Sequence, residues 1–244
     1  MKKNKLTKVF ENLKFKENYL IIHSDILSLY KFNFTLKELF DTLRNSLGND
    51  KILIFPTFNL KKSKKWYSNK SASESGSLSE FVRKNKKVVR SLNPIHSIII
   101  YGKKKNKIPI DKSFSSFGPN SPWEWLCKNK SVRNISIGIG FVGGATFCHY
   151  SEEKSKVFYR NYQKINTLVY NQKNKLINKK FIFFSRKKGF KNNWSRCEKY
   201  LRKKKIIIEH KNKYNIPILS MNTLLATKHI LRKISKDEKF LIGK

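Results

Sequence analysis

Residues 19–56 read YLIIHSDILSLYKFNFTLKELFDTLRNSLGNDKILIFP and hold two apolar runs on either side of a segment with helical spacing. The runs, Tyr19–His23 and Lys51–Phe55, are short and apolar, as buried strands are. Between them apolar residues recur at intervals of three and four, after an N-cap at Thr35 and before a stop at Gly48. A strand, a helix and a strand in this order predict a parallel βαβ unit.

The rest of the chain continues to alternate strands and helices. Further strands are expected at Ile98–Tyr101, Ile135–Phe141, Leu168–Tyr170 and Lys180–Ser185, and further helices after Gly76, after Ser121, at about 194–204 and at about 220–234. Residues 59–75, rich in Lys and Ser, are expected to form a long polar loop of the kind that covers an active site. The predicted fold is α/β, a single domain over residues 1–244 with a central mixed, largely parallel sheet flanked by helices.

The composition suits a folded protein of a reducing compartment. At 244 residues, 39% apolar and 13% aromatic, the chain can bury a core, which excludes a disordered protein. No stretch reaches the roughly 18 apolar residues that span a bilayer, and the start lacks the apolar run of a secretory signal. The three cysteines are widely spaced and the five histidines show no metal-binding spacing. We therefore expect a cytoplasmic protein that contacts no membrane and holds no metal.

The formal net charge of +38 raises the question of nucleic-acid binding. Lys, Asn and Ile are in excess along the whole chain, which is typical of an AT-rich genome. The segment from Ser113 to Ser151 holds three bases and one acid, a local net charge of +2. A nucleic-acid-binding protein combines bases and aromatic residues at its working surface, so nucleic acid is not the expected partner. A basic surface would also suit a polyanionic cofactor such as coenzyme A.

Clusters of polar residues stand at the ends of predicted strands. They are His23-Ser24-Asp25, Pro56-Thr57, Arg90-Ser91 and the segment from Gly143 to Glu152. In open α/β sheets, ligands bind at the carboxyl ends of strands, where loops and helix N-termini meet. These clusters therefore predict a binding site. In the alternative interpretation they are structural: His23 and His96 are hydrogen-bonded within the fold, and Arg90 forms an ordinary ion pair.

His149 and Glu152 are the pair of residues that suggests a general base. If a helix starts at Thr146, the two residues are three apart and share one face of it. A carboxylate beside an imidazole fixes the imidazole tautomer and raises its basicity, as a general base requires. The alternative is a surface His–Glu pair on a helix that Thr146 caps. Gly143-Gly144 ahead of the pair favours a site, because glycines let the backbone approach a ligand closely.

These motifs give the chain a resemblance to the aminoglycoside 3-N-acetyltransferase family, which is distinct from the GNAT superfamily. The motifs that match, in chain order, are His23-Ser24, Phe55-Pro56-Thr57-Phe58, Gly76-Ser77-Leu78, the block Arg90–Ser97, Gly118 through Ser121-Pro122, and Thr146 through His149 to Glu152. The match covers about residues 18–165 well. Residues 166–244 are a divergent, strongly basic part.

The resemblance implies an acetyl-CoA-dependent N-acetyltransferase without a metal, in which His149, supported by Glu152, is the base that acts on the acceptor amine. It implies that acetyl-CoA and the acceptor enter opposite ends of a cleft. The residues implied to bind the cofactor are His23, Ser24, Asp25, Arg90, Ser91 and Ser97, and those implied to bind the acceptor are Thr57, His96 and Thr146.

The acceptor is predicted from the charge balance. A polycationic antibiotic calls for an acidic pocket, but the chain has 16 acids against 54 bases. We therefore expect direct transfer to a primary amine of an amino sugar carried on a nucleotide or another anionic carrier, as in surface-glycan synthesis. The partner is then a small molecule, and a homodimer is left open.

Three other interpretations stay open at this point. The first is an aminoglycoside antibiotic 3-N-acetyltransferase, which an acidic acceptor pocket would support. The second is a basic nucleic-acid-binding protein without catalysis. The third is a degenerate family member that binds CoA without catalysis, against which the intact His149 and Glu152 argue.

Overall fold

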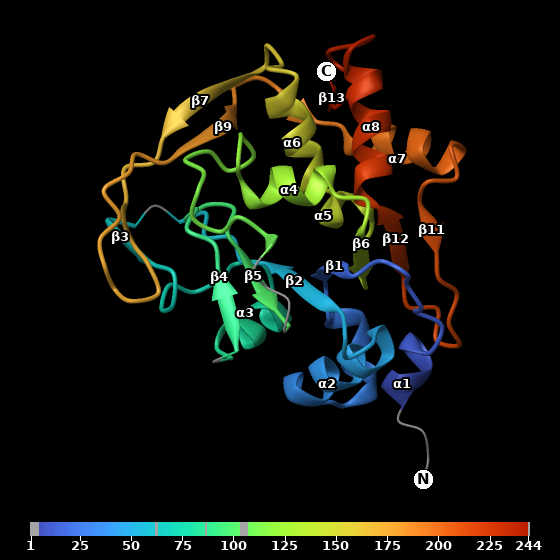
Figure 1. Cartoon of the computed structure of the whole chain (residues 1–244). Coiled ribbons are helices and arrows are strands. Elements are labelled where there is room, and N and C mark those ends of the chain that lie inside the picture. The colour runs from blue at the N-terminus through green and yellow to red at the C-terminus, as the bar shows by residue number, and fades with distance from the viewer. Residues whose placement is uncertain (1–4, 62, 86, 103–106, 244) are drawn as a thin grey trace.

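A computed structural model describes residues 5–61, 63–85, 87–102 and 107–243, and a seven-stranded sheet crosses its middle (Figure 1). The strand order is β11-β12-β6-β1-β2-β5-β4. Their bounds are β1 Tyr19–Ser24, β2 Ile52–Pro56, β4 Val88–Arg90, β5 Ile98–Tyr101, β6 Val132–Ile137, β11 Ile208–Glu209 and β12 Ile218–Asn222. β1 pairs in parallel with both β2 and β6, while β5 and β12 run the opposite way to the other strands. The expected mixed, largely parallel sheet flanked by helices is confirmed.

The predicted βαβ unit is β1, α2 (Leu36–Leu47) and β2. Thr35 starts the helix with a capping box: its hydroxyl accepts from the backbone N–H of Glu38 at 3.2 Å, and the Glu38 carboxylate accepts from the Thr35 N–H at 2.8 Å. Gly48 ends the helix at φ +103°, a conformation that side chains disfavour. These local sequence features therefore fix the length of the helix.

Helices cover both faces of the sheet, and alternation along the strands decides which side chain packs on which face. Tyr19 and Ile21 of β1 pack with α4 (Pro122–Lys128), α6 (Phe147–Lys154), α7 (Trp194–Lys203) and α8 (Thr223–Ile234). Leu20 and Ile22 pack with the elements of the other face, which are α1 (Lys5–Phe10), the 3-10 helix η1 (Leu27–Phe32), α2 and α3 (Ser77–Arg83).

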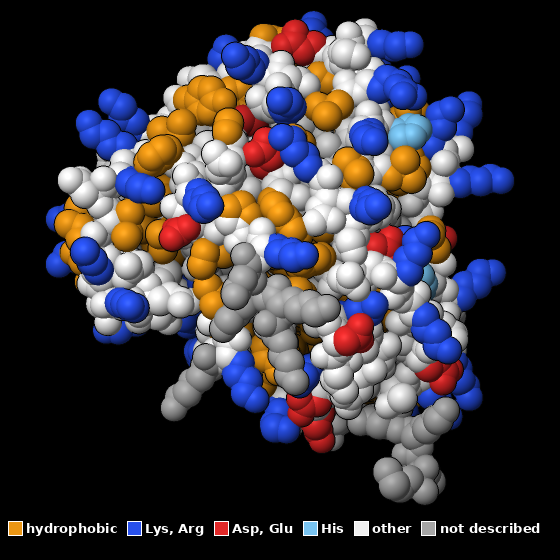
Figure 2. All heavy atoms as spheres, viewed as in Figure 1, with side chains coloured by type: hydrophobic (Ala, Val, Ile, Leu, Met, Phe, Trp, Pro, Cys, Tyr) orange, Lys and Arg blue, Asp and Glu red, His pale blue; other side chains and the backbone are white. Residues whose placement is uncertain are grey.

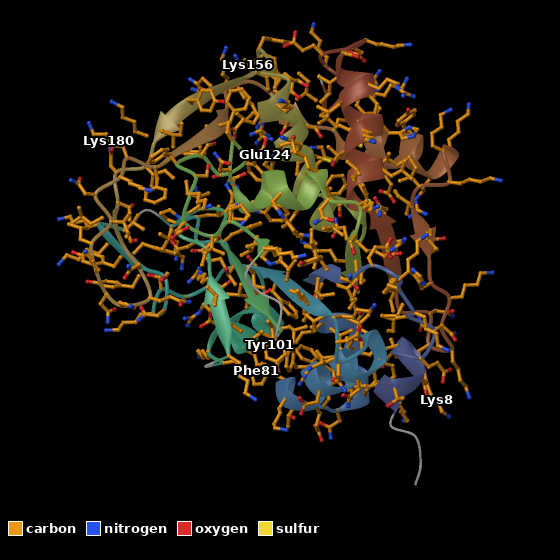
Figure 3. The ribbon with its side chains drawn as sticks, viewed as in Figure 1. Lys8, Phe81, Tyr101, Glu124, Lys156 and Lys180 are labelled. Carbon is orange, nitrogen blue, oxygen red and sulfur yellow. The ribbon has the colours of Figure 1, made fainter. Side chains whose placement is uncertain are left out.

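The labelled residues of Figure 3 mark the two faces. Glu124 lies on α4, above the sheet in this view, whereas Phe81 and Tyr101 lie together below it at α3 and the end of β5. Lys156 and Lys180 are exposed at the rim. Among the described helices none is long and apolar enough to cross a membrane.

Three two-stranded sheets complete the structure. Their strands are β3 (Lys65–Tyr67) with β8 (Leu168–Tyr170), β7 (Arg160–Lys164) with β9 (Ile182–Arg186), and β10 (Lys191–Asn192) with β13 (Ile242–Gly243). Residues 59–75, predicted as a loop, thus contain β3, whose Trp66 is fully buried with Val169 and Phe181. The prediction missed β3 because its partner strand lies about a hundred residues further along the chain.

Two predicted elements need correction. The strand expected at Ile135–Phe141 runs from Val132 to Ile137, and Phe141 begins a short helix, α5 (Phe141–Gly144). Gly138 ends the strand at φ +69°, where a Cβ atom would lie 2.0 Å from the carbonyl oxygen of Asp25. The helix expected from about 220 starts at Thr223, after strand β12, with Asn222 as its N-cap.

Candidate active site

His149 and Glu152 lie one turn apart on α6 and contact each other, with 2.6 Å between Nδ1 and Oε2. The Glu152 side chain is fully buried and the His149 side chain is 20% exposed, so a reactant can reach the imidazole but water cannot reach the carboxylate. Thr146 occupies the N-cap position of this helix, yet it has helical backbone angles and its side chain makes no capping bond. The expected cap at Thr146 is therefore wrong, although the expected face-sharing pair is present.

Arg160 of β7 completes the group. Its Nη2 lies 2.9 Å from Oε2 of Glu152, and its Nη1 donates to the carbonyl oxygen of Phe184 at 3.0 Å. Burial alone would raise the pKa of Glu152, but hydrogen bonds and charges from His149 and Arg160 lower it below its usual range. Nη2 of Arg160 also lies 3.0 Å from Nδ1 of His149. In the tautomer with the proton on Nδ1, the ionised Glu152 accepts that proton and the lone pair of Nε2 is free.

Aromatic rings surround His149. Trp194 of α7 meets it edge-on with 4.9 Å between ring centroids, Phe117 lies at 5.6 Å and His96 at 6.1 Å. Burial lowers the pKa of His149, the contact with Glu152 opposes this, and Arg160 and Arg186 add to the lowering. The imidazole is therefore neutral near pH 7.

His96 is fixed from several sides. Its Nδ1 lies 2.9 Å from the Ser116 hydroxyl, its backbone N–H donates to Oδ1 of Asn93 at 2.9 Å, and its carbonyl accepts from the indole of Trp123. Burial holds the pKa of His96 well below its usual value. The ring stands between His149 and Phe58, so its predicted contact with the acceptor is sterically reasonable and stays a prediction.

A cavity of about 380 Å³ opens beside the carboxyl ends of β1 and β2. Three residues predicted to bind the cofactor, His23, Ser24 and Asp25, line it together, alongside Gly143 and Phe58. Phe58 also packs edge-on against His96, with 5.2 Å between ring centroids. The cavity is thus linked to His149 through two adjoining rings.

The other predicted cofactor residues form a separate buried group. Arg90 donates Nε to the Ser97 hydroxyl at 3.0 Å, Nη2 to the Thr57 carbonyl at 2.5 Å and Nη1 to the Ser71 carbonyl, and its guanidinium lies over the ring of Trp66. The hydroxyls of Thr57 and Ser97 are 3.2 Å apart. The hydroxyl of Ser91 accepts from the backbone N–H of Ile98. These polar groups bond within the protein, and a role at the cofactor or acceptor stays a prediction.

Arg90→Met should separate the two roles of this residue. Burial lowers the pKa of Arg90 to about 9, and the guanidinium binds two backbone carbonyls and Ser97. Leaving those acceptors unpaired is expected to lower the free energy of unfolding by about 3 kcal/mol, measured by urea titration. The dissociation constant for acetyl-CoA should stay within a few-fold of the wild-type value. A variant of normal stability that bound acetyl-CoA much more weakly would show a ligand contact instead.

Sequence reasoning missed Arg160, Phe117 and Trp194. Arg160 lies on β7, Trp194 on α7 and Phe117 in the loop before α4, and no spacing rule connects them to His149. Arg160 is the first arginine after Glu152, but the sequence pattern predicts no strand at residues 160–164 that would bring it back to α6. Among the described residues, no cluster of three or more His, Cys, Asp or Glu side chains could hold a metal ion.

The comparisons with known proteins fit this geometry. A sequence model described as aminoglycoside 3-N-acetyltransferase matches residues 21–228. The chain belongs to this family. It is therefore an acetyl-CoA-dependent N-acetyltransferase, as the motifs indicated, and the interpretation as a nucleic-acid-binding protein without catalysis loses its support. No curated protein sequence matches the chain.

Solved structures share the fold at low identity. The apoenzyme of aminoglycoside acetyltransferase AAC(3)-IVa matches with a TM-score of 0.78 and 18% identity, over 98% of this chain and 90% of that one. AAC-IIIb in binary complex with CoASH gives 0.75 and 12%, over 95% of each chain. A mutant of AAC(3)-IVa in complex with a gentamicin gives 0.72 and 17%, over 93% of this chain and 85% of that one.

Proposed function

We propose that this N-acetyltransferase moves the acetyl group of acetyl-CoA onto a primary amine of an aminoglycoside-type amino sugar, with His149 as the general base. The observation that carries the proposal is the buried contact of His149 with Glu152, held in turn by Arg160. The comparisons support the ligands: AAC-IIIb binds CoASH, and a mutant of AAC(3)-IVa binds gentamicin.

An ammonium group has no lone pair with which to attack a thioester, so the amine reacts after it has lost its first proton to solvent. The neutral amine must lose a second proton as its nitrogen bonds to the carbonyl carbon. Nε2 of His149 takes this proton, and Glu152 stabilises the imidazolium that forms. The C–S bond then breaks and the thiolate leaves readily, because the pKa of a thiol is only about 8.5. Arg160 keeps Glu152 ionised throughout.

A covalent acyl-enzyme is not part of the proposal. Cys148 adjoins His149 in sequence, but it is fully buried, and burial followed by the neighbouring Cys197 raises the pKa of its thiol well above the usual value. A buried, protonated thiol is a poor nucleophile. Direct transfer from acetyl-CoA to the amine therefore agrees better with these contacts.

Unpaired polar atoms beside the β1 cavity support a role for this cavity in cofactor binding. The Nε2 atom of His23 and the hydroxyl of Ser24 are buried there without hydrogen-bond partners among the described residues. A polar ligand such as the acyl and amide groups of acetyl-CoA would satisfy them. His23, Ser24 and Asp25 would line the acyl end of the cofactor.

A nucleotide-linked amino sugar is the second candidate acceptor, favoured by the excess of 54 bases over 16 acids. Figure 2 shows Lys and Arg side chains spread over the visible face, with few acids between them. The family and its gentamicin-bound member support the aminoglycoside better than this candidate. A cytoplasmic location and a homodimer stay predictions.

Release of the CoA thiol from acetyl-CoA, followed with a panel of acceptors, tests the proposal. The panel contains gentamicin and other aminoglycosides, free amino sugars and nucleotide-linked amino sugars. We expect the highest kcat/KM with an aminoglycoside. Turnover confined to nucleotide-linked sugars would instead establish the second candidate, and no turnover together with no binding of acetyl-CoA would refute both.

A further inference from the structure

His23 is a second buried imidazole that the reaction as described does not use. It is 7% exposed, and its Nε2 is buried without a hydrogen-bond partner. None of the residues that the structure describes hydrogen-bonds to its ring. Most buried polar groups in proteins are paired, and His23 is unpaired although it lines the cavity beside β1, where a bound ligand could contact its ring.

The position of His23 places it on the same side of the sheet as α6. Tyr19 and Ile21 pack on that side, and alternation along β1 adds His23 to it. Its neighbour across the parallel pairing is Ser136 of β6, whose hydroxyl is also buried and unpaired. His23 therefore lies between the central strands and the segment that leads into α6.

The backbone of α5 closes over this spot. A Cβ atom on Gly144 would lie 2.0 Å from the Ser136 hydroxyl and 3.8 Å from the Cβ of His23, so only glycine allows the approach. His23 thus lines the cavity beside β1. His149 lies five residues after Gly144, on the next helix, α6.

The two histidines differ in their neighbours. His149 has an ionised carboxylate at 2.6 Å, which favours taking up a proton. His23 has no such partner, and burial lowers its pKa to about 4. His23 is therefore neutral at physiological pH, and a neutral imidazole without a carboxylate serves as a hydrogen-bond donor rather than as a base.

We propose that His23 donates a ring N–H to the carbonyl oxygen of the acetyl thioester and stabilises the negative charge that develops there. The inference rests on the proposed function. As the amine nitrogen bonds to the carbonyl carbon, the π electrons move to the oxygen, and the amine proton passes to His149. The electrons then return, the C–S bond breaks, and the CoA thiolate leaves. A preorganised donor at that oxygen accelerates such a step.

Three variants of His23 test this. Loss of an oxyanion donor lowers kcat by about 10²–10³-fold, so we expect that loss for His23→Ala, with the dissociation constant of acetyl-CoA within a few-fold of wild type. His23→Asn and His23→Gln place an amide N–H near the positions of Nδ1 and Nε2, and the one that retains more activity identifies the donor nitrogen. His229→Ala, which removes an imidazole from α8, is the matched control and should behave as wild type.

Difference infrared spectra of bound acetyl-CoA labelled with ¹³C at the carbonyl supply a direct readout, which needs no acceptor. The carbonyl band should shift to lower wavenumber in the wild type and in the active amide variant, and return toward its solution position in His23→Ala. An unshifted wild-type band, or the same shift in the wild type and in every His23 variant, would overturn the inference. If His23→Ala does not fold, the carbonyl bands of His23→Asn and His23→Gln are compared with the wild-type band instead. The same shift in all three would overturn the inference.

If the proposed function itself were wrong, the experiments would give a different set of results. The wild-type enzyme would then release no CoA with any amino sugar, or would not bind acetyl-CoA. If turnover depends on His149 while kcat and the carbonyl band are unaffected by substitutions at His23, only the inference about His23 is wrong.

Discussion

His149→Ala should lower kcat by about 10²–10⁴-fold, which is the usual contribution of a positioned general base. The reason is the geometry of the pair: Nδ1 of His149 lies 2.6 Å from Oε2 of Glu152. In the proposed mechanism Glu152 holds the proton on Nδ1, and Nε2 accepts the proton of the amine. The imidazole is only 20% exposed, and bulk water replaces it poorly. The dissociation constant of acetyl-CoA, measured by calorimetry, should be nearly unchanged, because the ring contacts are with Trp194, Phe117 and His96.

Chemical rescue of His149→Ala by imidazole tests the same role in a second way. The alanine substitution leaves a space the size of the ring beside Glu152, and added imidazole should restore part of the turnover while it has no effect on the wild type. A variant that folds, binds acetyl-CoA and keeps wild-type kcat would show that the base is another group. Loss of acetyl-CoA binding in His149→Ala would mean that His149 belongs to the cofactor site.

Glu152→Gln is expected to affect both activity and stability. The amide can donate to Nδ1, which would put the proton of His149 on Nε2, the atom that must be free; an equivalent change in a catalytic triad lowers kcat by about 10⁴-fold. Arg160, 7% exposed, also loses its charged partner. Breaking such a buried pair lowers the free energy of unfolding by about 3–5 kcal/mol, which urea titration would measure.

The pH profile of kcat/KM gives a second readout on the same variant. In the wild type the acid limb should lie below pH 6.5, because burial lowers the pKa of His149 and the base must be unprotonated. Glu152 raises that pKa, so its neutralisation should move the acid limb of the remaining activity to lower pH. Glu153→Gln is the matched control: Glu153 is also buried on α6, at 4% exposed against 0% for Glu152, but it accepts a hydrogen bond from Ser115, so the limb should stay in place. If the acid limb of Glu152→Gln lay at the same pH as in the wild type, Glu152 would not influence the pKa of the base.

The local parts of the structure could be predicted from the sequence. Strand β1, helix α2 with its capping box and strand β2 follow from periodicity and from Thr35 and Gly48, all within forty residues. The shared face of His149 and Glu152 follows from their spacing. Both predictions hold because each depends on contacts between near neighbours in the chain.

The parts that could not be predicted depend on distant pairing. Arg160 reaches Glu152 because β7 turns back over α6, and Trp194 reaches His149 because α7 packs beside it. Arg90, predicted to bind the cofactor, donates to the backbone carbonyls of Thr57 and Ser71 and lies over Trp66 of β3. The sequence did not predict these contacts. None of these arrangements has a periodic pattern or a spacing in the sequence.

The contact of Trp194 with His149 has a consequence for how the enzyme is made. The ring of the proposed base lies on α6, while the indole against it comes from α7, in the basic C-terminal part of the chain. During synthesis, at about 5–20 residues per second, the strands around β1 leave the ribosome well before α7 does. The nascent chain therefore exposes the side of the His149 ring that Trp194 later contacts, until α7 packs against it.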